Sequence, residues 1–96
     1  MRTYVSVNKT IFVQDIGDVD PTELTRFVDG RQGIFFDSTV GANLIVTEDD
    51  RLFTSGLVRD TGAFQHELVE FQPGVGGADV IDRAPLRFAD NTVTVP

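Results

Sequence analysis

Short runs of apolar residues alternate with polar ones along most of the chain, and this is the pattern of half-buried β-strands. Residues 3–16 are rich in β-branched and aromatic side chains, and Asn8 and Lys9 interrupt them where a tight turn fits. This segment predicts a β-hairpin.

Further strands are predicted downstream. Residues 33–37 and 43–47 carry two nearly continuous apolar runs, and the polar stretch 48–51 has the composition of a turn leading into a strand at residues 52–54. Residues 92–95 alternate strictly between Thr and Val. We therefore expect a mainly β fold, a small barrel or sandwich of short antiparallel strands.

One segment carries the signals of a short α-helix. Asp20 suits the N-cap, Pro21 the first helical position and Glu23 the capping-box partner. Apolar side chains follow at helical spacing, at Leu24, Phe27 and Val28. We expect a helix over residues 21–29 that ends at Gly30.

Residues 63–71 fit two interpretations. Phe64, Leu68 and Phe71 recur at helical spacing, whereas the turn-forming residues 60–62 before them suggest the tip of a hairpin. The β-rich surroundings favour a strand.

Glycines interrupt the chain at residues 73–77, which predicts an exposed loop. Pro85 argues against a central strand nearby. Residues 73–96 are therefore expected to form an extended loop and a C-terminal strand available for assembly.

Length and composition limit the chain to one domain, residues 1–96. With 96 residues and 41% hydrophobic side chains, it can bury a single core but is small enough to gain stability from a partner. It contains no cysteine, so disulfides, thiolate nucleophiles and zinc–cysteine sites are excluded.

The charge balance bears on partners. Fifteen Asp and Glu residues face eight Lys and Arg residues, of which Lys9 is the only lysine, and the net charge is -7. Such a surface disfavours nucleic acids and anionic membranes, and the scattered arginines form no basic stripe. Arg59, Arg83 and Arg87 are expected to pair with carboxylates in the fold or across an interface. The acid excess also suits a halophilic source, although a GC-rich genome alone favours Arg over Lys.

Four carboxylates lie close together at Asp15, Asp18, Asp20 and Glu23, and they are the candidate ligands for calcium. Their spacing departs from that of an EF-hand loop, and helix capping accounts for the last two. We predict no bound metal and no other cofactor.

No complete catalytic set is visible. His66 is the only histidine, and none of the serines lies in a nucleophile-elbow motif, whether Ser6, Ser38 or Ser55. The glycines at residues 74–77 lack the Lys-Ser/Thr of a phosphate loop. We therefore predict that the chain is not an enzyme.

Small size, acidity, absence of cysteine and β-prone segments at both ends together resemble, in general character, the small structural proteins of tailed viruses, such as capsid cement or decoration proteins and tail components. The resemblance extends over the chain and rests on no single motif. It implies a virion protein that forms homo-oligomers or binds a capsid or tail lattice through strand edges. The expected contact residues are Leu86, Phe88, Val93 and Val95.

The alternative is a calcium- or carbohydrate-binding β-module in the cytoplasm. A single tyrosine, Tyr4, and the absence of tryptophan argue against a sugar-binding platform.

Overall fold

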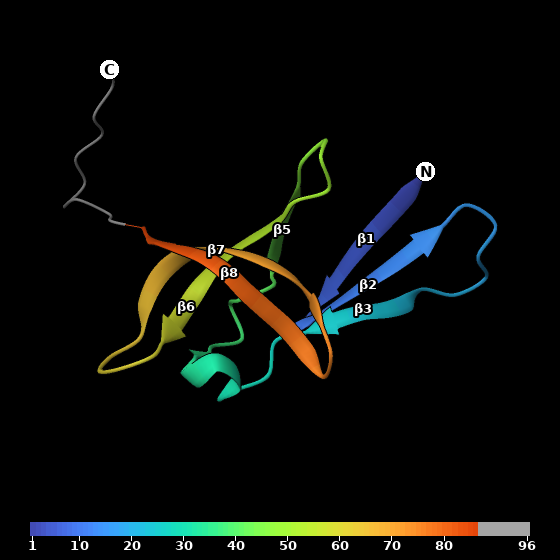
Figure 1. Ribbon diagram of the computed structural model, residues 1–96. Coiled ribbons are helices and arrows are strands. Elements are labelled where there is room, and N and C mark those ends of the chain that lie inside the picture. Colours follow the sequence, from blue (N-terminus) through green and yellow to red (C-terminus); the bar gives the residue numbers. More distant parts are fainter. Residues whose placement is uncertain (87–96) are drawn as a thin grey trace, which may run out of the picture.

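The computed structural model describes residues 1–86, and they form two antiparallel β-sheets. The first sheet has the order β1-β2-β3, and the second has the order β4-β6-β7-β8 with β5 paired to β6 (Figure 1). The strands are β1 (Arg2–Val7), β2 (Thr10–Asp15), β3 (Thr22–Arg26), β4 (Phe35–Phe36), β5 (Asn43–Val46), β6 (Leu52–Arg59), β7 (Gln65–Gly74) and β8 (Gly77–Pro85). The mainly β prediction is therefore confirmed.

The hairpins follow the predicted turns. β1 and β2 pair from Arg2↔Asp15 to Val7↔Thr10, and Asn8 adopts the left-handed conformation that such a tight turn needs, with φ of 50°. The segment 63–71, which fitted helix or strand, lies mostly in β7. Its helical spacing is outweighed by pairing with β6 on one side and β8 on the other.

The predicted helix over residues 21–29 is wrong. Residues 22–26 form β3, which pairs with β2, and the only helical element of the described chain is a single 3-10 turn, η1 (Arg31–Gly33). Pairing as a strand buries Thr25 and Phe27, two residues apart, to 4% and 3% exposure. Glu23 binds the Arg26 guanidinium instead of capping a helix. The burial gained by pairing as a strand therefore outweighs the local preference for a capped helix.

The core lies between the two sheets and is centred on three aromatic rings. The Phe27 ring lies 5.1 Å from that of Phe36 and 4.8 Å from that of Phe71, centroid to centroid. In Figure 1 the β7–β8 hairpin curls so that its tip lies beside β3, and β3 contacts both strands. This curl closes one side of the fold, while the opposite side stays open.

The glycine-rich stretch is a tight turn rather than the expected loop. Pro73 pairs with Ala78 and Gly74 with Gly77, so only Val75 and Gly76 lie at the tip of the β7–β8 hairpin. Gly76 has φ of 83°, a conformation that glycine adopts without strain. Pro85 ends the edge strand β8, where its missing N–H costs no pairing.

Candidate interaction groove

A groove of about 730 Å³ lies between the two sheets, and strands β1, β3, β5, β6 and β7 contribute to its lining. We call it the edge groove, and it is lined by Arg2, Tyr4, Leu24, Val46, Asp50, Leu52 and Pro73. Leu24 and Val46 are partly buried against the core, so their remaining apolar surface faces the groove. The volume falls within the ~300–1,000 Å³ typical of binding sites.

Strands β1 and β5 flank the edge groove and splay apart (Figure 1). They approach one another where β1 ends, because a Cβ added at Gly41, just before β5, would lie 3.4 Å from the Asn8 carbonyl oxygen and 3.6 Å from Ser6 Oγ. From there β1 leads back toward Arg2 and β5 leads on toward Val46. The two strands therefore lie close together near Gly41 and diverge toward Arg2 and Val46, which both line the groove.

The β1 wall presents to the groove backbone groups that have no partner within residues 1–86. The Ile16 N–H donates to the Met1 carbonyl at 3.2 Å, which extends the β1–β2 ladder by one bonded pair. Bonded and non-bonded pairs alternate along an antiparallel ladder. The N–H and C=O groups of Arg2 and Tyr4 therefore point away from β2, toward the open edge.

The β5 wall also presents to the groove backbone groups that have no partner among the described residues. The Thr47 N–H donates to the Arg51 carbonyl at 3.0 Å, directly after the β5–β6 ladder. The same alternation directs the backbone groups of Leu44 and Val46 away from β6. Two strands whose outward backbone donors and acceptors have no partner within residues 1–86 thus border one groove with a mixed polar and apolar lining.

The edge at β4 is blocked by side chains. Asp29 Oδ1 accepts the Phe36 N–H at 2.9 Å, and Lys9 Nζ donates to the Phe36 carbonyl at 3.3 Å. The backbone hydrogen bond from Phe36, with Lys9 adding to it, holds the pKa of Asp29 below its usual range. Both backbone groups of Phe36 that a new strand would need are already bonded.

The edge at β8 is blocked in a similar way. The Gln32 side chain donates from Nε2 to the Val80 carbonyl at 3.0 Å and accepts the Val80 N–H at 2.7 Å. Its amide thus pairs with the strand as a neighbouring peptide would, and Pro85 offers no N–H further along. Unlike β4 and β8, β1 and β5 have no such blocking side chain among the described residues.

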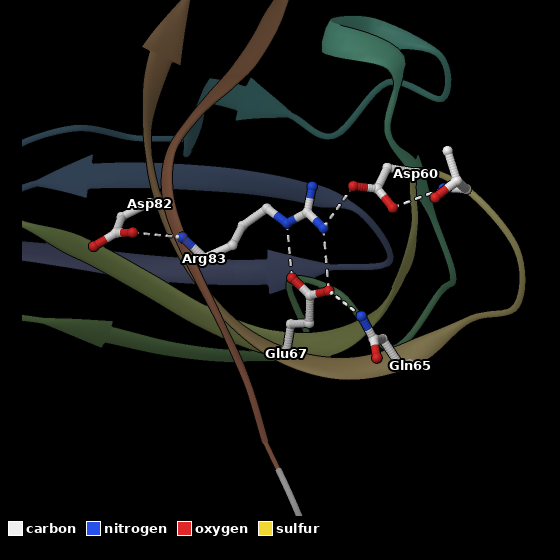
Figure 2. A network of polar contacts seen from close by, with 6 residues as sticks. Asp60, Gln65, Glu67, Asp82 and Arg83 are labelled. Carbon is white, nitrogen blue, oxygen red and sulfur yellow. Dashed lines mark hydrogen bonds and ion pairs between the residues drawn. The ribbon is translucent and has the colours of Figure 1, made fainter.

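A second polar feature lies at the other end of the second sheet (Figure 2). Glu67 is 2% exposed and is held by Arg83, which donates from Nε to Oε1 at 2.7 Å and from the second guanidinium nitrogen to Oε2 at 3.2 Å. Gln65 also donates to Oε2, at 3.1 Å, and Arg83 reaches Asp60 at 3.1 Å. Every carboxylate oxygen of Glu67 is therefore bonded.

This network joins the start of β7 to the end of β8. The hydrogen bonds that Arg83 donates to Glu67, with the one to Asp60 adding to them, raise the pKa of Arg83. The Thr61 N–H and then Arg83 lower the pKa of Asp60. Since the acceptors and donors are matched within the fold, the network acts as a structural clamp, and the expectation that Arg83 pairs with carboxylates is confirmed.

The four candidate metal ligands do not converge. Asp15 pairs with Arg2 at 2.9 Å, which lowers the pKa of that carboxyl, and Asp18 accepts the Asp15 N–H at 2.9 Å. Glu23 is held by Arg26, and Asp20 is exposed. Within residues 1–86 no group of three or more Asp, Glu or His side chains is placed to hold a metal ion.

Of the four expected contact residues, the structure describes one. Leu86 is 36% exposed, and its N–H donates to the His66 carbonyl at 2.9 Å, just beyond β8. Phe88, Val93 and Val95 lie outside the described residues.

Sequence reasoning missed the edge groove and the burial of Glu67. A signal for Glu67 was present in the alternation of β7. Every second side chain of the strand points to the same face, and this places Glu67 on the face of the core residues Val69 and Phe71. The edge groove had no local signal, since its walls come from distant segments.

The described chain is thus a mainly β protein of two antiparallel sheets, in which the outward edges of β1 and β5 border one groove. Comparison with family models, with curated proteins and with solved structures finds no match. No helix within residues 1–86 is both long and apolar enough to span a membrane.

Proposed function

We propose that this chain is a non-enzymatic assembly protein that binds neighbouring subunits through open strand edges and its C-terminal segment. The supporting observation is the contrast between edges. β4 and β8 are blocked by side chains, whereas no residue within 1–86 bonds the outward backbone groups of β1 and β5 beside the groove. An unprotected edge is a template for strand addition and is normally avoided in a protein that works alone.

The setting we propose is the particle of a tailed virus, as a capsid cement or decoration protein or a tail component. The support is compositional: a 96-residue chain without cysteine and with net charge -7 has little core of its own. Binding to a lattice stabilises such a chain by mass action. Mass spectrometry of purified particles from the source of the sequence tests this setting, and absence of the chain from them would contradict it.

Deletion of residues 91–96 tests the assembly function. Light scattering coupled to size exclusion gives the mass of the full chain and of the shortened chain over a range of protein concentrations. We expect the full chain to form oligomers and the shortened chain to be a monomer with an unchanged circular dichroism spectrum, because the described core lies within residues 1–86. A shortened chain that assembles as the full chain does would contradict the proposal.

One observation favours a second candidate, a carbohydrate-binding β-module. Tyr4, the only tyrosine, lines the edge groove together with the polar side chains of Arg2 and Asp50. An aromatic ring beside hydrogen-bonding groups is a usual sugar contact. A rise in melting temperature with an oligosaccharide panel, in a chain that stays monomeric, would favour this candidate over assembly.

A further inference from the structure

We propose that the edge groove of one copy takes residues 92–95 of a second copy as an added β-strand. This inference rests on the proposed assembly function and specifies its contact. It names both partners in the contact, the groove between β1 and β5 and the Thr-Val-Thr-Val segment near the C-terminus.

The side-chain pattern of the segment matches the groove. In an extended strand Val93 and Val95 point to one face and the two threonines to the other. The groove lining includes the apolar side chains of Leu24 and Leu52 beside the polar groups of Arg2 and Asp50. The valines would cover the apolar part of the lining while the threonines stay hydrated.

The backbone of the segment also matches. A bound strand needs donors and acceptors on at least one side, and the groove has them on both, at Arg2 and Tyr4 of β1 and at Leu44 and Val46 of β5. None of residues 91–96 before the final Pro96 is a proline, so each can donate its N–H. The added strand would join the two sheets across their open side.

Chain length favours a second copy over the same copy. Leu86 is bonded to His66, which pairs with Leu57, and Leu52 lies five residues further along β6. A strand added beside β5 would lie four strand spacings from β8, so the straight path from Leu86 to it is roughly 20–25 Å. The six residues from Leu86 to Thr92 also span about 20 Å when fully extended. That path runs through β7, and any path around the sheet is longer.

Charge sets the conditions for the contact. Two copies of net charge -7 repel one another, whereas residues 91–95 include no acidic or basic side chain. A neutral segment can therefore enter the groove without bringing further charge, and added salt screens the repulsion between the two bodies. We expect assembly to strengthen as the salt concentration rises.

Two pairs of matched variants of the full chain test the proposal. Val93→Thr with Val95→Thr makes the groove-facing side polar at nearly constant shape, while Thr92→Val with Thr94→Val changes the other side. Val46→Asp places a charge in the groove, and Ile45→Asp places it on the opposite face of β5, where Ile45 is 57% exposed. We expect the first member of each pair to weaken assembly about tenfold or more, and the second to leave it within about threefold.

A competition experiment with the unmodified chain covers the case in which Val46→Asp does not fold. A peptide with the sequence of residues 90–96 should dissociate the oligomer, and the same peptide with both valines replaced by threonine should not. The inference would be overturned if the double valine variant and the double threonine variant weakened assembly equally, or if neither peptide dissociated the oligomer. Either result would leave the assembly function standing. A chain that is monomeric at every concentration up to its solubility limit would overturn both.

Discussion

The clamp between Glu67 and Arg83 makes the sharpest prediction about stability. Replacing Arg83 with methionine keeps the length of the apolar stem and removes the guanidinium. The Glu67 side chain is 3% exposed and that of Arg83 24%, so the change leaves a buried carboxylate with only the Gln65 donor. Breaking a buried ion pair costs ~3–5 kcal/mol, and because Arg83 is partly solvated and one donor remains, we expect a loss of about 2–4 kcal/mol.

Urea unfolding of the monomeric chain at pH 7, followed by circular dichroism, measures this loss. A loss of about 2–4 kcal/mol is a large share of the ~5–15 kcal/mol expected for a whole domain. The matched control is Arg51→Met, which breaks the pair between Arg51 and Glu70, where the Arg51 side chain is 52% exposed. We expect a smaller loss there, because the Glu70 side chain is 12% exposed against 3% for Glu67, and the Arg51 guanidinium is open to water.

A further result follows from the same reasoning. The double variant Glu67→Leu with Arg83→Met should regain most of the lost stability, since an apolar pair replaces a buried charge. If Arg83→Met and Arg51→Met are equally stable, the clamp does not hold the second sheet as we infer.

The remaining predictions concern packing, edges, pH and metal. Gly56→Ala should cost about 1–3 kcal/mol in urea unfolding, because the new Cβ would lie 2.6 Å from the Val40 backbone; a neutral change would contradict that packing. Gln32→Ala should expose the β8 edge and raise light scattering in concentrated samples, with unchanged scattering as the contrary result. The pKa values of Asp60 and Glu70 are lowered in the folded chain. The stability that these two carboxylates contribute is therefore complete above their unfolded pKa values, ~3.9 and ~4.3, and is lost as the pH falls through their folded pKa values. Melting temperatures measured as the pH is lowered check this. Calcium should leave the melting temperature unchanged, because no acidic cluster in residues 1–86 is placed to bind it, and a clear rise would contradict this account.

Much of the fold could be predicted where the signal was local. The turn at Asn8 and the polar turn before β6 lie where their composition indicated, since tight turns depend on few neighbouring residues. The helix expected over residues 21–29 failed because its capping signals are weaker than the burial of Phe27 against two other rings. That contact joins three separate strands or loops and leaves no trace in local spacing.

The sequence predicted the type of candidate site, a strand edge, but not its position. Strand edges were expected to matter, but which edges are open depends on side chains from elsewhere in the chain. Gln32 blocks β8 from 48 residues away, and Lys9 reaches β4 from 27 residues away. A single sequence carries no local mark of such distant hydrogen bonds, so the pairing of two open edges across one groove emerged only in the folded chain.

Amide hydrogen exchange of the full chain, measured dilute and assembled, tests the central claim most directly. The account predicts that the amides of Tyr4 and Val46 exchange rapidly in the dilute chain and become protected on assembly, while the amide of Val80, already bonded to Gln32, changes little. Protection that appears along β8 and leaves Tyr4 and Val46 exchanging freely would contradict the claim that the edge groove is the binding surface.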